Sequence, residues 1–192
     1  MNGLYYFKCS CFILTIIYLV SFKKLMSTSI PASTPDEKNS SEQPAKLPDL
    51  MVDSTQGSFN LQTLQGHYTL LYFYPKDLTA GCTTQAQDFR DLLAEFEKLG
   101  VKIYGVSRDT LKSHDKFTLK ESIPFALISD PNETLCRYFD VIKTKNMYGK
   151  QVQGIERSSF LFDQQGQLIQ SWRKVKAAGH AALVLNFIQQ HI

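Results

Sequence analysis

Apolar runs of two different periods alternate along residues 48–192, and this alternation limits the fold more than any other feature. Tyr68–Tyr74 is a dense apolar run of strand length, typical of a buried strand. Residues 83–99 then carry large apolar side chains at helical spacing, and Gly100 is suited to end the helix. Val101–Val106 is the next run of strand length. These runs predict a buried strand, an amphipathic helix and a second strand in immediate succession.

The rest of this region continues the same pattern. The order of strands and helices predicts an α/β fold, with a central mixed β-sheet flanked by helices on both faces. This content is similar to that of thioredoxin-like folds. Asp163–Gly166 has the composition of a hairpin turn between the last two strands. The further strands are expected at Gly57–Leu61, Phe125–Ile128, Ser158–Phe162 and Leu168–Trp172, and the further helices at Thr110–Ser122, Asp130–Phe139 and Gly179–Gln190.

An apolar segment occupies residues 1–25. Its stretch 4–22 contains a single charge and is nearly long enough to span a bilayer, which takes about 17–25 residues. Two lysines follow it directly. This fits a cleaved signal peptide poorly, because the positive charges of a signal peptide precede its apolar run. The positive-inside rule then favours a cytoplasmic main domain, with a periplasmic one as the alternative. The segment is therefore either a membrane anchor or, if Met26 is the true start, not translated.

Residues 26–47 are rich in Ser and Pro and poor in large apolar side chains, a composition typical of flexible linkers. The folded domain should therefore begin near Pro48. The sequence predicts three parts: the apolar segment 1–25, the linker 26–47 and a thioredoxin-like domain over 48–192.

Charge and histidine spacing exclude several classes of function. The net charge is only +3, and the one compact basic stretch, Arg173–Lys176, is interpreted as a solvated edge or loop, so no nucleic-acid partner is predicted. The four histidines show no metal-ligand spacing, and no glycine-rich phosphate loop occurs. No metal or nucleotide cofactor is therefore predicted.

The chain has four cysteines: Cys9, Cys11, Cys82 and Cys136. Their spacing excludes a zinc ribbon, because no pair of Cys-x-x-Cys knuckles exists, and their number excludes a disulfide framework. Cys9 and Cys11 fall in the apolar segment, which leaves two for the folded domain. A thiol-disulfide oxidoreductase is also disfavoured, because Gln85 stands where a second thiol would follow Cys82 in such a pair.

Cys82 lies where a strand and a turn lead into a predicted helix. The unpaired N–H groups and the positive dipole end of a helix start both favour thiolate over thiol, and the thiolate is the nucleophile. Helical spacing puts Cys82 on the same apolar face as Ala86 and Phe89, so its side chain should point partly inward. A buried structural cysteine is the alternative, but Pro75 and Gly81 shape a loop around a helix start rather than pack a core.

Ionisation alone cannot account for an enzyme's rate. A free thiol with a pKa of about 8.5 is mostly protonated at neutral pH. Complete ionisation therefore raises its reaction rate by at most ~30-fold, which corresponds to roughly 2 kcal/mol. Enzymes typically accelerate reactions by ~10⁶ or more. A second group must therefore stabilise charge as it moves onto the leaving group. The candidates are the hydroxyl of Thr79, the backbone amides of Gly81 and Cys82, and a guanidinium from elsewhere.

Residues 73–83, Phe-Tyr-Pro-Lys-Asp-Leu-Thr-Ala-Gly-Cys-Thr, closely resemble the peroxidatic motif of peroxiredoxins, Pro-x-x-x-Thr-x-x-Cys. More narrowly, they are similar to the bacterioferritin-comigratory (peroxiredoxin Q) class. The resemblance continues through residues 146–150 and 154–163 and spans about 48–190. It implies a thiol peroxidase that acts on hydrogen peroxide or organic hydroperoxides.

The resemblance also implies roles for single residues. Cys82 would attack the peroxide O–O bond and become a sulfenic acid. Thr79 would hydrogen-bond the substrate oxygens, and Arg157 would lie near the thiolate and polarise the peroxide. Pro75 would shield the thiolate from water. On the same basis we expect a monomer that takes its electrons from an external thiol partner.

The sequence departs from the class at its resolving cysteines. Many members carry one five residues after the peroxidatic cysteine, where this chain has Gln87; others carry it on the next helix, but Thr110–Ser122 has none. Ala80 also replaces a frequent proline. Either the sulfenic acid is reduced by glutathione, thioredoxin or glutaredoxin in a one-cysteine mechanism, or Cys136 resolves it. A disulfide with Cys136 would need the two Cα atoms within about 7 Å. A non-enzymatic redox sensor or holdase is the alternative outside enzymes.

Overall fold

The computed structural model describes residues 45–147 and 150–192. The apolar segment 1–25, with its expected membrane anchor, and almost all of the predicted linker lie outside the described residues. Among the helices that are described, none is both long and apolar enough to cross a bilayer. The carbonyl of Ala45 accepts a hydrogen bond from the amide of Leu168, and Leu47 is buried. The chain is therefore part of the fold a few residues before Pro48.

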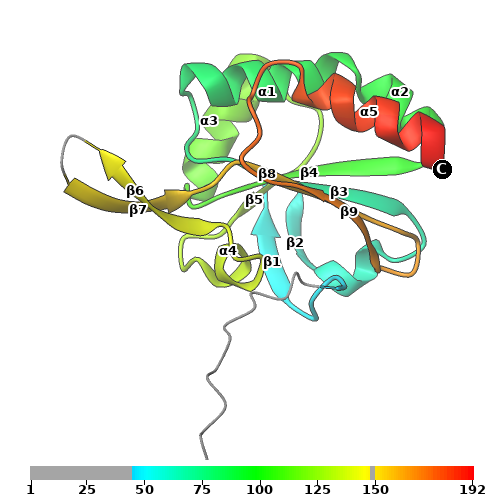
Figure 1. Cartoon of the computed structure of the whole chain (residues 1–192), viewed down its shortest axis with the longest axis horizontal. Coiled ribbons are helices and arrows are strands. Elements are labelled where there is room, and N and C mark those ends of the chain that lie inside the picture. The colour runs from blue at the N-terminus through cyan, green and yellow to red at the C-terminus, as the bar shows by residue number, and fades with distance from the viewer. Residues whose placement is uncertain (1–44, 148–149) are drawn as a thin grey trace, which may run out of the picture. The chain divides into compact units, whose positions relative to one another are not determined.

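A seven-stranded mixed sheet forms the centre of the domain (Figure 1). Its strand order is β2-β1-β5-β4-β3-β8-β9. The neighbours β3, β4 and β5 are parallel, and the other neighbours are antiparallel. The predicted central mixed sheet is confirmed. The strands are β1 (Met51–Ser54), β2 (Gly57–Asn60), β3 (Tyr68–Phe73), β4 (Val101–Ser107), β5 (Leu127–Ser129), β8 (Ser158–Phe162) and β9 (Leu168–Trp172).

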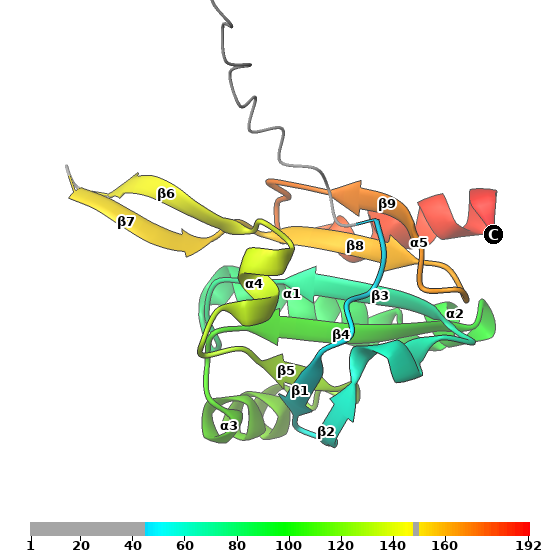
Figure 2. The same ribbon diagram turned by 90° about the horizontal axis from the view of Figure 1, so that it is seen from below.

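Helices cover both faces of the sheet, as predicted, but unequally. Four helices pack on one face, and the short helix α4 lies on the other (Figures 1 and 2). The four are α1 (Ala80–Asp91), α2 (Leu93–Lys98), α3 (Leu111–Glu121) and α5 (His180–His191); the opposite face carries α4 (Thr134–Tyr138) and a 3-10 helix, η1 (Leu61–Leu64).

The long helix predicted at residues 83–99 is two helices in the structure. Helix α1 starts three residues earlier, at Ala80, and ends before Leu92, whose ψ of 1° leaves the helical region. Helix α2 follows at once, and Phe96 stays buried although the axis is interrupted. The predicted apolar face is confirmed for α1, because Cys82, Ala86 and Phe89 are all buried.

Three strands were not predicted. Strand β1 pairs with β2 at the amino end of the domain, and β6 (Ile142–Met147) and β7 (Lys150–Ile155) form a separate antiparallel hairpin. The segment 143–146, Lys-Thr-Lys-Asn, is wholly polar, so the hairpin leaves no apolar run to detect. The hairpin projects from the rest of the domain (Figure 2).

Two helix predictions differ in detail. Helix α4 begins at Thr134 rather than Asp130, because Glu133 has a φ of 58° and cannot continue a right-handed helix. Helix α5 begins at His180 rather than Gly179, and it buries Val184 and Leu185 while Leu183 is exposed.

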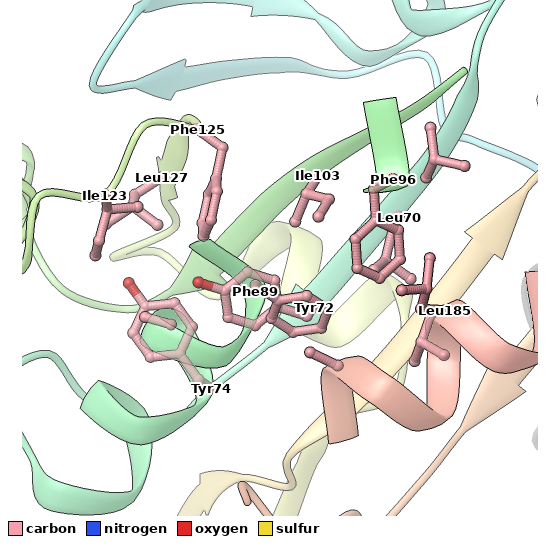
Figure 3. Close-up of a cluster of buried hydrophobic side chains, with 14 of the residues drawn as sticks. Leu70, Tyr72, Tyr74, Phe89, Phe96, Ile103, Ile123, Phe125, Leu127 and Leu185 are labelled. Carbon is pink, nitrogen blue, oxygen red and sulfur yellow. The ribbon is translucent and has the colours of Figure 1, made fainter. Parts of the chain in front are cut away.

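Side chains along β3 alternate between two hydrophobic cores, because successive residues of a strand point to opposite faces. Leu70 and Tyr72 enter the core beneath the four helices, and Leu71 and Phe73 enter the core beneath α4. In the first core the ring of Tyr72 lies against that of Phe89, with centroids 4.8 Å apart (Figure 3). The sheet therefore separates two packed layers.

Gly105, in the middle of β4, provides the space that the Tyr72 ring occupies. A Cβ at this position would lie 2.7 Å from both the Tyr72 hydroxyl and Cδ2 of Leu127. Because these side chains are fully buried, we expect Gly105→Ala to lower the free energy of unfolding by about 1–3 kcal/mol, measured by urea denaturation. Gly154→Ala is the control, because nothing lies within 4 Å of its Cβ position. Equal losses in the two variants would contradict this explanation.

Candidate active site

The loop between β3 and α1 places Cys82 at the carboxyl end of a central strand. Strand β3 ends at Phe73, and α1 begins after Thr79, which adopts an extended backbone. Cys82 is the third residue of α1 and is only 2% exposed. Its thiol thus lies where sites form in α/β folds, at the carboxyl edge of the sheet, and it is covered from bulk solvent.

Arg157 meets this thiol from the segment between β7 and β8. Its Nη2 lies 3.2 Å from Sγ of Cys82, and its Nη1 donates to the side-chain carbonyl of Gln85. Gln85 is itself fully buried, one turn along α1. The structure therefore brings together Cys82 and Arg157, residues 75 positions apart, and Gln85 fixes the orientation of the guanidinium.

Sequence reasoning missed Gln85. A signal was present, because a polar residue three positions after Cys82 lies on the same side of the helix as the thiol. The buried Nε2 of Gln85 has no hydrogen-bond partner among the described residues. The hydrogen bond to Arg157 therefore uses only the carbonyl end of the Gln85 amide.

Pro75 and Thr79 frame the same loop. The hydroxyl of Thr79 donates to the carbonyl of Lys76 at 3.0 Å and leaves its lone pairs free to accept. Thr79 is exposed, and Pro75 is half-buried. The first amides of α1, including those of Gly81 and Cys82, have no intrahelical acceptor, and the Thr79 side chain does not cap them. They are donors for an incoming oxygen.

Tyr72 lies beneath the site. Burial raises its pKa above the usual range, and the nearby charges of Cys82 and Asp77 act in the same direction. Its hydroxyl has no hydrogen-bond partner among the described residues. The phenol therefore stays protonated and does not serve as a base for the thiol.

A buried carboxylate, Asp77, anchors the loop from below. It accepts hydrogen bonds from the hydroxyls of Tyr74, at 2.8 Å, and Ser113, at 2.7 Å. His114 Nδ1 lies 2.9 Å from its second oxygen. The backbone amide of Asp77 also donates to Asp109 at 2.8 Å. The loop that carries Pro75 and Thr79 is thus tied to the start of α3.

His114 is the buried partner of Asp77. It is fully buried, and its Nε2 faces the carbonyl of Ile128 at 3.2 Å while Nδ1 faces the carboxylate. With an acceptor at each nitrogen, the imidazole makes both hydrogen bonds only when both nitrogens carry hydrogen. Burial by itself would raise the pKa of Asp77, but the hydrogen bonds and charge of His114 outweigh it, with help from Ser113 and Tyr74, and the pKa is lowered.

With this geometry established, the chain was compared with known proteins. The AhpC/TSA family profile matches residues 44–171. Peroxiredoxin Bcp of Xanthomonas campestris is 56% identical over 151 residues, which cover 78% of this chain and 94% of the relative. The chain is a peroxiredoxin of the AhpC/TSA family. As a peroxiredoxin it is a thiol-dependent peroxidase, which takes a peroxide substrate and a thiol reductant.

Further relatives place this peroxiredoxin in the Bcp (peroxiredoxin Q) class. Peroxiredoxin Bcp of Bacillus subtilis is 46% identical, with 75% of this chain and 92% of the relative covered. A structure of Xanthomonas campestris peroxiredoxin Q superposes with a TM-score of 0.73 at 55% identity, covering 77% of this chain and 96% of that one. A structure of a cysteine-to-serine mutant of Xylella fastidiosa PrxQ has a TM-score of 0.74 at 39% identity. The match covers 78% of this chain and 98% of that one. The thioredoxin-like fold implied by the resemblance is thereby confirmed.

Cys136, the other candidate for the redox cycle of this peroxiredoxin, lies on the other face of the sheet. Cys82 belongs to the core beneath α1, and Cys136 belongs to the core beneath α4. Burial raises the pKa of the Cys136 thiol far above its usual value, and the charge of Asp130 adds to this. The Cys136 amide donates to Asp130 at 2.7 Å. Both cysteines are free thiols in the structure, and the sheet stands between them.

His180, at the start of α5, is buried and uncharged. Its Nε2 lies 2.8 Å from the Ser159 hydroxyl. Burial, together with the positive charge of Arg157, lowers its pKa from 6.5 to about 4. The unfolded chain therefore binds a proton near pH 6.5, but the folded chain does so only near pH 4. Stability is lost as the pH falls through this window and recovers as it rises.

The expected size of this loss is about 3 kcal/mol between pH 7 and pH 4. His180→Gln keeps a partner for Ser159 but does not titrate, so its unfolding free energy should depend much less on pH in this window. Urea denaturation at half-unit pH steps measures the difference. His67→Asn, at an exposed position, is the control and should follow the wild type. A His180→Gln profile parallel to the wild type would refute the assignment.

Proposed function

We propose that this peroxiredoxin reduces hydrogen peroxide and organic hydroperoxides through a sulfenic acid on Cys82, in a one-cysteine cycle completed by an external thiol. The contact between the Cys82 thiol and the Arg157 guanidinium supports this most directly. A structure of the Xanthomonas campestris bacterioferritin comigratory protein is described in terms of alkyl peroxide reduction, which supports the inclusion of organic hydroperoxides.

In the first step the Cys82 thiolate attacks one peroxide oxygen. The S–O bond forms as the O–O bond breaks, so the sulfur is oxidised to sulfenic acid and the departing alkoxide or hydroxide takes up a proton. Arg157 stabilises negative charge on sulfur and on the leaving oxygen. The amides of Gly81 and Cys82 donate to the peroxide, and Thr79 accepts from its hydroxyl. Donors arranged in advance around developing charge are worth most in a site that excludes water.

Three placements support the one-cysteine cycle. Gln87 occupies the near resolving position and bonds to Glu121. Helix α3 contains no cysteine. Cys136 is buried in the core on the opposite face of the sheet from Cys82. Among the described residues, therefore, no second thiol lies on the Cys82 side of the sheet.

Two matched variants test the proposal. Cys82→Ser should abolish peroxide consumption with any thiol, because serine cannot be oxidised in its place. Cys136→Ser should keep turnover within about twofold, because its only expected effect is a change in core packing. Peroxide consumption is followed with glutathione and, separately, with a thioredoxin system.

Mass spectrometry after one equivalent of peroxide gives the second readout. A sulfenic acid on Cys82, trapped with a dimedone reagent, is the expected product. A disulfide between Cys82 and Cys136, or loss of turnover in Cys136→Ser alone, would overturn the one-cysteine cycle. Oxidation of Cys82 without turnover under any thiol would instead favour a redox sensor. The monomeric state remains a prediction, which light scattering tests.

A further inference from the structure

The basic stretch Arg173–Lys176 borders the active site in the structure. It lies in the loop that joins β9 to α5, which passes beside α1 (Figure 1). The amide of Val175 donates to the carbonyl of Arg157 at 3.0 Å, and the Cβ of Ala177 lies 3.8 Å from the position of a Cβ on Gly81. Val175 thus contacts Arg157, the residue whose guanidinium lies against the Cys82 thiol, and Ala177 lies beside the first turn of α1.

Side chains along this stretch alternate in environment. Arg173 is held inward, where its guanidinium donates to the carbonyls of Phe139 and Asp140. Lys174 and Lys176 are exposed. Neither forms an ion pair with a carboxylate within residues 45–147 and 150–192. Lys174 also has a φ of 51°, a conformation that costs energy for a residue with a Cβ.

Lys76 adds a third exposed ammonium group, on the β3–α1 loop that carries the site. It too has no ion pair among the described residues, and its carbonyl receives the Thr79 hydroxyl. Lys76, Lys174 and Lys176 are called the lysine rim below. Two loops that meet at Cys82 therefore carry unpaired positive charge and attract anions over roughly a Debye length, about 8 Å at physiological salt.

The burial of Cys82 limits the size of a reductant that this rim can serve. Because the residue is only 2% exposed, any thiol reaches its sulfur only after the surrounding side chains move, and a small molecule needs the smallest movement. A cysteine on the surface of a folded protein needs a larger displacement, one that includes the first turn of α1. The geometry therefore favours a small thiol over a protein thiol.

We propose that the lysine rim binds the carboxylate of a small carboxylate-bearing thiol and directs its sulfur to the Cys82 sulfenic acid. This inference rests on the proposed one-cysteine cycle. The thiolate attacks the sulfenic sulfur, an S–S bond forms, the S–O bond breaks, and the hydroxide leaves as water with a proton from the medium. A second thiol then attacks the mixed disulfide and releases the Cys82 thiolate and the oxidised disulfide of the reductant. Two thiols are oxidised for each sulfenic acid reduced.

A charge series of thiols tests the proposal. The sulfenic acid is formed with one equivalent of hydrogen peroxide and mixed with cysteamine (cationic), 2-mercaptoethanol (neutral) or 3-mercaptopropionate (anionic), with rate constants expressed per thiolate. Mass spectrometry follows the mixed disulfide. In Lys174→Gln/Lys176→Gln, the ratio of the 3-mercaptopropionate rate to the 2-mercaptoethanol rate should fall roughly tenfold. The ratio of the cysteamine rate to the 2-mercaptoethanol rate should rise in the same variant.

Lys98→Gln/Lys102→Gln is the matched control. It removes the same charge near the amino end of β4, the far end of that strand from the site, and both lysines are exposed. Its rate ratios should equal those of the wild type. Because the control carries the same net charge as the rim variant, a tenfold change in the rim variant alone identifies a local effect.

Three outcomes would overturn the proposal. One is an equal change in both double variants. Another is a rim variant that slows only the peroxide step, measured with linoleic acid hydroperoxide against its methyl ester, which would assign the rim to an anionic peroxide. The third is a rim variant that slows only reduction by a thioredoxin. If the wild type forms mixed disulfides with these thiols but shows no peroxidase turnover, the one-cysteine cycle is refuted. The rates of mixed-disulfide formation still test the lysine rim in that case.

Discussion

Replacing Arg157 with methionine is expected to lower the second-order rate constant for Cys82 and hydrogen peroxide by about 100- to 1000-fold, the usual effect of removing one donor to developing charge. Methionine keeps an unbranched apolar stem like that of arginine but removes both guanidinium contacts, to Sγ of Cys82 and to Gln85. Stopped-flow fluorescence or competition with a second peroxidase measures the rate constant.

The control for this variant is Arg137→Met, which breaks an exposed ion pair with Glu133 and should leave the rate constant unchanged. Arg157→Lys should have a rate constant between those of the wild type and Arg157→Met, because lysine keeps the charge but lacks the planar pair of donors. A second readout is independent of catalysis. The charge of Arg157 helps to lower the pKa of His180, so that pKa should rise in Arg157→Met. A fall of less than about threefold in the peroxide rate would refute the role given to Arg157.

Asp77→Asn is expected to lower the free energy of unfolding by about 3–5 kcal/mol, because it removes the buried carboxylate that His114, Tyr74 and Ser113 contact. The substitution preserves shape and changes only charge and hydrogen-bonding capacity. It also loosens the loop that carries Thr79, so the peroxide rate should fall with stability. Urea denaturation at pH 7 measures the first effect.

An exposed ion pair supplies the comparison. Asp91→Asn breaks the contact with Arg90 at the surface and should cost at most about 1 kcal/mol. In the double variant Asp77→Asn/His114→Gln both charges are gone, and part of the loss should be recovered. The pH dependence has a definite sign. The lowered pKa of Asp77 gives stability that is present at neutral pH and lost as the pH falls through the folded-state pKa. If Asp77→Asn costs no more than Asp91→Asn, the buried pair does not stabilise the loop.

The sequence predicted the elements that combine an apolar pattern with a clear end. Strands β3 and β4 lie close to their predicted positions because each is a largely apolar run of strand length. Strands β8 and β9 do so because the turn Asp163–Gly166 marks the boundary between them. The β6–β7 hairpin could not be found in this way, since its residues are largely polar and pair only with each other. The break at Leu92 was invisible for another reason: the apolar stripe continues across it, and periodicity does not record a local change in ψ.

The candidate active site was predictable only in part. Helix position and turn chemistry identified Cys82, whereas Arg157, 75 residues away, was selected by family resemblance alone. The pair of Asp77 and His114 was missed, because a single aspartate in a loop and a single histidine on a helix look like surface residues until the fold buries them together. The relation of Cys136 to Cys82 depended on which face of the sheet each one occupies, and spacing along the chain does not contain that information.

The alternation of side chains along β3 has a kinetic consequence. The sheet separates Cys82 from Cys136, and in the proposed one-cysteine cycle an oxidising equivalent that enters at Cys82 is not passed to Cys136. In the proposed cycle the sulfenic acid then waits for a thiol from solution, and during that wait a second peroxide can convert it irreversibly to sulfinic acid. The lifetime of the active enzyme is therefore set by the ratio of thiol to peroxide around it, rather than by the protein itself.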